Sequence, residues 1–133
     1  VMAVEFFISN DLIFVNEIAP RPHNSGHFSL DACINNQFDQ QVRALTGMPL
    51  ADTSNHYDAV MVNLLGDIWY KDEKIINPPF EDITSMELPI GIHLYGKKEP
   101  RKSRKMGHFT VTGKNLEEIT NTANQVKKIL FVD

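Results

Sequence analysis

The sequence predicts an α+β fold: a β-hairpin, a loop and a helix, then a small, mostly antiparallel β unit closed by a C-terminal helix. Three observations support this. Two β-rich apolar runs flank the turn signal "SND" within the first 18 residues. Three more short apolar runs lie further along the chain. The final segment repeats apolar residues at the spacing of a helix.

The composition limits the class of protein. The chain has 133 residues, of which 42% are hydrophobic, and a formal net charge of −4. The hydrophobic content is enough for a core, and the negative charge argues against general binding of nucleic acid. No apolar run reaches the length of a membrane span. Cys33 is the only cysteine, so an internal disulfide and a Cys-based zinc site are excluded, and a cytoplasmic location fits.

The first half is expected to hold the hairpin and one helix. Val1–Ile8 and Leu12–Ile18 are β-rich runs that should pair as a hairpin. Prolines and a glycine interrupt regular structure over Pro20–Gly26. A helix is expected over Asn36–Leu45, because its first residue suits the N-cap and a glycine and a proline follow it. Its apolar face would carry Phe38, Val42 and Leu45.

The second half is expected to be the β unit. The polar stretch 51–58 is interpreted as a linker, so the expected domains are residues 1–50 and 51–133. The predicted strands are Ala59–Gly66, Leu88–Gly96 and Met106–Gly113. A strongly basic loop separates the last two strands. The final helix is expected over Leu116–Leu130, where Asn115 and Glu118 fit a capping arrangement.

Two glutamates in the hairpin suggest a metal site. A three-residue turn, Asn10–Leu12, would place Glu5 directly opposite Glu17. Like charges that face each other across two strands are destabilising, and a divalent cation would reverse the sign of that interaction. Carboxylate oxygens suit Mg²⁺, with Mn²⁺ as an alternative. A two-residue turn would instead place Glu5 opposite Asn16, and two solvated glutamates on an exposed face remain an alternative.

The segment "NEIAPRPHNSGH" adds groups that suit an anion. Arg21 can hold a phosphate or carboxylate through two parallel hydrogen bonds. His23 can donate a hydrogen bond or move a proton near neutral pH, and Asn24 is a neutral donor. The neighbouring prolines reduce the freedom that the loop loses on ordering. Metal carboxylates beside anion-binding groups are what phosphoryl transfer requires.

A zinc site at His23 and His27 is disfavoured. Their spacing suits one helical face, but the sequence between and before them contains Pro22 and Gly26, and no third ligand is evident. His27 is therefore interpreted as a structural residue where the loop meets the helix. Cys33 is interpreted as a small buried hydrophobic residue.

The chain resembles the N5-carboxyaminoimidazole ribonucleotide synthetases, also named the ATPase subunit of phosphoribosylaminoimidazole carboxylase. "NEIAPRPHNSGH" followed by "QFDQQVRA" resembles the C-terminal part of their ATP-grasp region. "AVMVNLLG", "HLYGKKEPRKSRKMGHFTV" and the final helix resemble their small C-terminal domain. The chain opens as a strand already in progress, so we expect a fragment that lacks the N-terminal domain and the ATP lid.

The resemblance implies a reaction of de novo purine biosynthesis. The enzymes of that family are ligases, although the older carboxylase naming made them lyases. In their reaction, ATP phosphorylates bicarbonate to carboxyphosphate. The amine of 5-aminoimidazole ribonucleotide then takes the carboxyl group, which leaves ADP and phosphate. The implied cofactors are ATP and Mg²⁺ or Mn²⁺, without a nucleic acid or membrane partner, and a homodimer is expected for the full-length enzyme. The isolated chain is expected to be inactive.

The resemblance also implies roles for single residues. The acidic residues that hold Mg²⁺ in ATP-grasp enzymes map onto Glu5 and Glu17. Related enzymes often have a further asparagine ligand at the position of Ala19, so an additional ligand is in doubt. The residues that match the loop around bicarbonate and carboxyphosphate are Arg21, His23 and Asn24.

The basic loop matches family positions near the 5′-phosphate of the ribonucleotide. The matching residues are Lys97, Arg104 and Lys105. The family commonly has "RPGRK" where this chain has "RKSRK", so Lys102 and Ser103 leave the backbone less fixed. The other basic residues of the loop, Lys98, Arg101 and Lys102, are interpreted as solvated charges.

Two alternative functions stay open. Another carboxylating or amide-forming ATP-grasp ligase would share Glu5 and Glu17 but use a different acceptor. A non-catalytic module that descended from such an enzyme would retain the motifs without the activity. "APRPHNSGH" together with "SRKMGH" favours the purine enzyme, and the intact acidic pair with Arg21 and His23 argues against decay.

Overall fold

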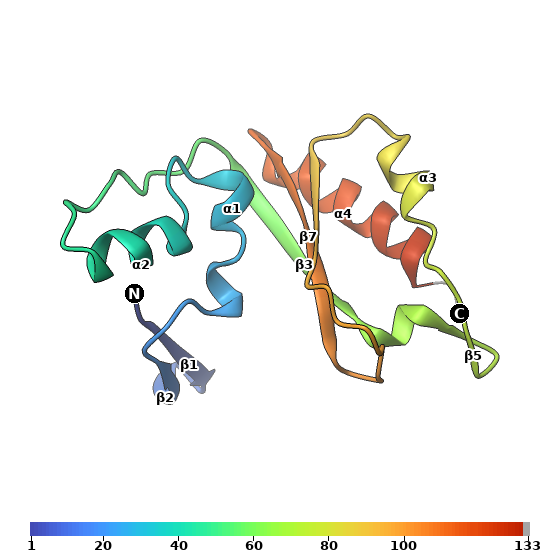
Figure 1. The fold of residues 1–133 in the computed structure, drawn as a ribbon, viewed down its shortest axis with the longest axis horizontal. Coiled ribbons are helices and arrows are strands. Elements are labelled where there is room, and N and C mark those ends of the chain that lie inside the picture. The colour runs from blue at the N-terminus through green and yellow to red at the C-terminus, as the bar shows by residue number, and fades with distance from the viewer. Residues whose placement is uncertain (132–133) are drawn as a thin grey trace. The chain divides into compact units, whose positions relative to one another are not determined.

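The computed structural model describes residues 1–131 and combines helices with antiparallel sheets, which confirms the α+β class (Figure 1). The chain divides between His56 and Tyr57 into two compact units. The predicted hairpin and the loop that follows it lie in the first unit. The basic loop and the C-terminal helix lie in the second.

The hairpin has a two-residue turn. Strands β1 (Ala3–Ser9) and β2 (Leu12–Ala19) pair in antiparallel fashion, with Ser9 opposite Leu12. The turn residues Asn10 and Asp11 have φ angles of 49° and 60°. Such angles belong to the tight turns that match the twist of paired strands, and Asn and Asp tolerate them. The predicted three-residue turn is therefore wrong.

A β-bulge nevertheless restores the predicted pairing of the glutamates. The register set by the turn persists as far as Phe6 opposite Val15, and then Glu5 pairs with Glu17. Asn16 is the extra residue of the bulge, and its side-chain amide donates a hydrogen bond to Glu5 Oε2 at 3.3 Å. Bulges redirect side chains locally. This one brings the two carboxylates to facing positions.

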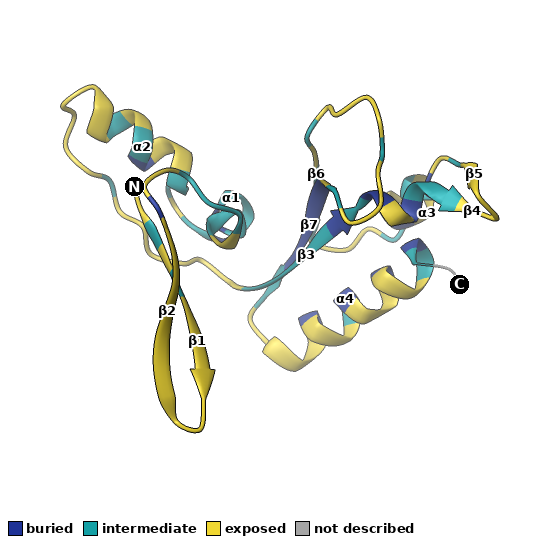
Figure 2. Cartoon of the chain, turned by 90° about the horizontal axis from the view of Figure 1, so that it is seen from below, coloured by how far each residue is buried: buried dark blue, intermediate teal, exposed yellow. Residues whose placement is uncertain are grey.

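The hairpin is exposed along almost its whole length (Figure 2). Its exposed apolar side chains belong to both strands: Val4, Phe6, Phe7, Ile8, Leu12, Ile13, Phe14, Val15 and Ile18. A two-stranded hairpin is only marginally stable by itself, and exposed apolar patches are typical of surfaces that bind a partner, a membrane or a ligand.

Helix α2 (Gln37–Leu45) has the predicted N-cap. Asn36 Oδ1 accepts hydrogen bonds from the backbone N–H groups of Phe38 and Asp39, at 2.8 and 3.1 Å. Asp39 Oδ2 accepts one from the Asn36 backbone N–H, which completes a capping box. The predicted apolar face is not buried in this chain, since Leu45 is 75% exposed and Phe38 and Val42 are also exposed.

Two short helices before α2 were not predicted. The 3₁₀ turn η1 (Asn24–Gly26) follows the loop, and α1 (Ser29–Ala32) comes next. Helices of three or four residues show too little periodicity for a sequence pattern to reveal them.

The polar segment after α2 is bound to the first unit. The Gln40 side chain bonds to both backbone groups of Ala51. The His56 backbone N–H donates to Ala32 O at 2.7 Å, and Cys33 forms a β-bridge with Asn55. The compact units therefore divide at His56 rather than at Leu50. The assignment of domains from the sequence stays a prediction.

The second unit contains the three predicted strands and the predicted final helix. Strands β3 (Asp58–Leu65), β7 (Lys105–Gly113) and β6 (Ile90–Leu94) form one antiparallel sheet in that order. Helix α4 (Leu116–Leu130) lies along this sheet (Figure 1). The core between them includes Leu64, Phe109, Val111, Ile119, Ala123, Val126 and Leu130.

Several short elements connect β3 to β6. They are η2 (Gly66–Trp69), β4 (Tyr70–Lys71), β5 (Lys74–Ile75) and α3 (Phe80–Thr84). Trp69 packs against Phe80, with ring centroids 5.8 Å apart. Trp69 is partly buried against the core of the second unit. Among residues 1–131, no helix is long and apolar enough to cross a lipid bilayer.

Candidate functional site

The two facing glutamates and His23 form one cluster in the first unit. His23 Nδ1 lies 3.5 Å from Glu5 Oε1, and His23 Nε2 lies 3.2 Å from Glu17 Oε1. One ligand atom from each residue lies within 4.8 Å of those of the other two. The side chain of His23 is only 11% exposed, whereas that of Glu17 is 53% exposed. The cluster therefore opens to solvent on its carboxylate side.

Gln37 holds the backbone of His23 in place. Its Oε1 accepts a hydrogen bond from the His23 N–H at 2.8 Å, and its Nε2 donates to the His23 carbonyl at 2.9 Å. A Cβ added at Gly26 would lie 2.7 Å from Gln37 Oε1, so a glycine suits this contact. The sequence-based reasoning missed Gln37. The one signal in the sequence was its position directly after the N-cap asparagine of α2.

The His23 ring is also held by its own turn. His23 is the N-cap of η1, where Nδ1 accepts from the Ser25 N–H at 3.3 Å and lies 2.9 Å from Ser25 Oγ. The ring orientation is thus set by the chain and not by the glutamates alone. A pocket of about 360 Å³ beside the ring is lined by both Arg21 and His23, so these two predicted residues face one space.

The remaining predicted loop residues differ in exposure. Arg21 is exposed, and its guanidinium donates to the Pro22 carbonyl at 3.0 Å. Asn24 is half-buried in η1. His27 Nδ1 lies 2.7 Å from Gln37 Nε2, and its ring stacks on Phe38 with centroids 5.7 Å apart. The structural role expected for His27 is therefore confirmed.

Cys33 differs from the interpretation made from the sequence. It is half-buried rather than buried, and its thiol donates a hydrogen bond to Asn55 Oδ1 at 3.0 Å. Partial burial raises the pKa of the Cys33 thiol, because removal from water disfavours the thiolate. The Cys33 side chain therefore acts as a hydrogen-bond donor that joins α1 to the segment before the second unit.

In the second unit, the predicted phosphate-binding residues lie at the two ends of the basic loop. Lys97 Nζ donates to the backbone carbonyl of Lys105, the first residue of β7. Arg104 is half-buried, and its guanidinium donates to the Glu99 carbonyl at 3.0 Å. The two ends of the basic loop are thus joined by hydrogen bonds from its own cationic side chains.

The neighbours of that loop include an exposed ion pair and a buried histidine. Arg101 pairs with Glu99 at 2.9 Å on the exposed surface, which agrees with its interpretation as a solvated charge. His108 is buried in β7, and Tyr95 Oη lies 2.8 Å from its Nδ1. The Lys97 ammonium lies 5.5 Å from the centre of the Tyr95 ring, within the range of a cation–π contact.

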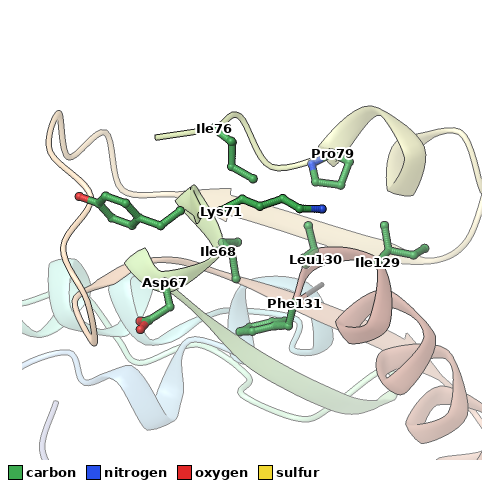
Figure 3. Close-up of a pocket in the computed structure, with 9 residues that line it drawn as sticks. Asp67, Ile68, Lys71, Ile76, Pro79, Ile129, Leu130 and Phe131 are labelled. Carbon is green, nitrogen blue, oxygen red and sulfur yellow. The ribbon is translucent and has the colours of Figure 1, made fainter. Parts of the chain in front are cut away.

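An apolar pocket of about 360 Å³ lies elsewhere in the second unit (Figure 3). It is lined by Asp67, Ile68, Tyr70, Lys71, Ile76, Pro79, Ile129, Leu130 and Phe131. None of these is a predicted site residue. The lining holds one ammonium and one carboxylate beside apolar side chains, and Asp67 is already bonded to the basic loop.

Comparison with known proteins decides the family. Residues 1–38 match the ATP-grasp domain model, and residues 59–122 match the model described as the phosphoribosylaminoimidazole carboxylase C-terminal domain. The N5-carboxyaminoimidazole ribonucleotide synthase of Staphylococcus aureus (strain COL) is 45% identical over 130 residues, which cover 96% of this chain and 31% of that protein. The chain belongs to the N5-carboxyaminoimidazole ribonucleotide synthase family.

Other synthases of this family give the same extent of similarity. The Bacillus subtilis synthase is 43% identical over 125 residues, which cover 90% of this chain and 31% of that protein. The crystal structure of the Thermotoga maritima synthetase has a TM-score of 0.83 at 44% identity. The matched region covers 96% of this chain and 35% of the Thermotoga maritima chain. The chain therefore spans about a third of the length of the synthases that it matches.

A fungal synthase extends the comparison to a structure with bound molecules. The enzyme of Aspergillus clavatus in complex with ADP and 5-aminoimidazole ribonucleotide has a TM-score of 0.79 at 29% identity. The similarity covers 98% of this chain and 34% of that synthase.

Proposed function

We propose that this chain supplies the metal carboxylates and the carboxyphosphate loop of an N5-carboxyaminoimidazole ribonucleotide synthase. The complete enzyme would carboxylate 5-aminoimidazole ribonucleotide at the expense of ATP. The observation that carries this proposal is the meeting of Glu5, Glu17 and His23 at a β-bulge, within a chain of this family. The ADP and ribonucleotide bound to the Aspergillus clavatus relative support the substrate class.

The acidic pair fits a magnesium ion. Glu5 and Glu17 offer oxygen ligands from facing strands, and Mg²⁺ in nucleotide sites is commonly held by one or two carboxylates with phosphate oxygens and water. The partial exposure of both side chains leaves access for those further ligands. When bound, the ion would neutralise charge on the ATP phosphates.

Arg21 and His23 would handle the carboxyl group. In the proposed reaction, a bicarbonate oxygen attacks the γ-phosphorus of ATP, and ADP leaves. The ribonucleotide amine then attacks the carboxyl carbon of carboxyphosphate, and phosphate leaves. Arg21 and His23 line one pocket, and His23 also contacts both glutamates. Hydrogen-bond donors at such a place stabilise charge that develops during transfer. Asn24 would complete this loop as a neutral donor.

The basic loop would hold the 5′-phosphate of the ribonucleotide. Arg104 would supply the main contact, because a guanidinium matches a phosphate with parallel hydrogen bonds, and Lys97 and Lys105 would add charge. We also infer a homodimer for the complete synthase and a cytoplasmic location.

The chain by itself is expected not to hydrolyse ATP. The first unit holds metal carboxylates and anion-binding groups, but its hairpin is exposed and the chain spans about a third of the matched synthases. The test is to incubate the purified chain with ATP, Mg²⁺, bicarbonate and 5-aminoimidazole ribonucleotide, beside the complete synthase as a positive control. Ribonucleotide-dependent phosphate release by the chain alone would contradict this expectation.

The same assay tests the acceptor. With the complete synthase, phosphate release should depend on 5-aminoimidazole ribonucleotide and on bicarbonate. Release that depends instead on a different amine or carboxylate would assign the chain to another ATP-grasp ligase. A complete protein that binds ATP but turns over no acceptor would indicate a non-catalytic module.

A further inference from the structure

Residues 66–70 of the second unit form hydrogen bonds to backbone groups of the basic loop. The Gly66 N–H donates to the Arg104 carbonyl at 2.8 Å. The Tyr70 hydroxyl donates to the Pro100 carbonyl at 2.7 Å. Between these two contacts, the carboxylate of Asp67 accepts a hydrogen bond from the Ser103 N–H at 2.7 Å. Three contacts thus hold the backbone of residues 100, 103 and 104.

The approach is close enough to require glycine at one point. A Cβ added at Gly66 would lie 2.1 Å from Arg101 O and 2.6 Å from Arg101 N. These are backbone atoms, which cannot move aside without a shift of the whole loop. The loop is therefore seated directly against the start of η2, and its position depends on that segment.

Ser103 adopts a backbone conformation that is unfavourable for most residues other than glycine. Its φ angle is 61°, in the left-handed region that glycine enters most readily. This chain has serine at that position. A non-glycine residue there costs about 1 kcal/mol. The charge-assisted hydrogen bond that the Ser103 N–H donates to Asp67 Oδ2 offsets such a cost. Sequence-based reasoning expected a less fixed backbone at Ser103, and the structure shows what holds it.

We propose that Asp67 is a positioning residue for the ribonucleotide phosphate. Its carboxylate keeps Ser103 in the left-handed conformation and so orients the adjacent Arg104 and Lys105 toward a phosphomonoester. The inference rests on the proposed function, because it names what sets the geometry of the same phosphate site. Arg104 closes the turn by donating its N–H to Arg101 O at 3.0 Å, so its side chain follows the turn that Asp67 maintains.

The sign of the effect separates positioning from simple electrostatics. A carboxylate near a cationic site opposes anion binding by its charge. If charge alone mattered, removal of Asp67 would strengthen binding of the ribonucleotide. If Asp67 positions the loop, its removal weakens that binding in spite of the gain in positive potential.

The test uses Asp67→Ala and Asp67→Asn in the complete synthase. Asp67→Ala should raise KM for 5-aminoimidazole ribonucleotide about tenfold, the effect of losing one charge-assisted hydrogen bond, with KM for ATP unchanged. Asp67→Asn keeps an acceptor oxygen without the charge, so its KM for the ribonucleotide should equal or fall below that of the parent. Ser103→Gly should recover most of the loss in the Asp67→Ala background. Glu81→Ala, which removes an exposed carboxylate of α3, is the matched control and should change neither KM.

Amide hydrogen exchange provides a readout that does not depend on the substrate. The Ser103 amide should be protected in the parent and in Asp67→Asn, and should exchange faster in Asp67→Ala. If Asp67→Ala leaves the ribonucleotide KM unchanged or lowers it, while Arg104→Ala raises it, Asp67 is not a positioning residue. If Arg104→Ala also leaves that KM unchanged, the phosphate assignment of the proposed function is wrong. The proposed positioning role of Asp67 is then wrong as well.

Discussion

Replacement of Glu17 by glutamine should remove most ATP turnover from the complete synthase that contains this chain. We expect a fall in kcat on the order of 100-fold or more, because a bound metal supplies several kcal/mol of charge stabilisation during phosphoryl transfer. A neutral amide is a poorer ligand for Mg²⁺ than a carboxylate. Glu17 lies opposite Glu5 and close to His23. Among the described residues of the first unit, Glu5 and Glu17 are the carboxylates of this cluster.

The same hairpin offers a matched control. Asp11 lies in the turn at the far end of the strands, and its φ angle of 60° is one that asparagine tolerates. Asp11→Asn makes the same change from acid to amide without touching the cluster, and should leave turnover unchanged. Turnover is measured over a series of Mg²⁺ concentrations. Near-normal turnover by Glu17→Gln at low Mg²⁺ would contradict the role of Glu17 as a ligand.

Replacement of Arg21 or His23 by alanine should lower carboxylation much more than it lowers ATP binding. Both residues line one pocket, and His23 also contacts Glu5 and Glu17, where carboxyphosphate is proposed to form. Loss of one donor to a developing charge costs roughly 100-fold in rate. Product formation and ATP affinity are to be measured in parallel on each variant of the complete synthase.

Arg43 provides the control for loss of a cation. It lies on α2 in the same unit and bonds to the Pro49 carbonyl, away from the cluster residues. Arg43→Ala should leave carboxylation within about twofold of the parent, the range of ordinary surface substitutions. Unchanged carboxylation in Arg21→Ala and His23→Ala, or a loss expressed entirely as weaker ATP binding, would show that the loop serves the nucleotide instead.

The larger elements were predictable because their signals are local. The caps of α2 and α4 rest on Asn36 and Asn115, each of which bonds to backbone groups two and three residues further on. The hairpin strands follow from β-rich runs around a turn. The exposed apolar face of α2 could not be predicted, because a pattern shows which face is apolar and not what covers it.

The facing glutamates were predicted correctly through an incorrect turn. The sequence "SNDL" allows turns of either length, and the bulge at Asn16 has no local signal. A register error and an unforeseen bulge therefore cancelled at Glu5. Gln37 and Asp67 were missed for another reason: they bond to backbone groups 14 and 36 residues away in the sequence, and such proximity arises only in the folded chain.

The most direct test of the central claim follows oxygen from bicarbonate to phosphate. The complete synthase is supplied with ATP, 5-aminoimidazole ribonucleotide and bicarbonate labelled with heavy oxygen, and the phosphate product is analysed by mass spectrometry. If carboxyphosphate forms, the oxygen that attacked the γ-phosphorus stays with phosphorus, so each phosphate should carry one heavy oxygen, and Arg21→Ala and His23→Ala should reduce the yield of labelled phosphate. Phosphate released without the label would contradict the account.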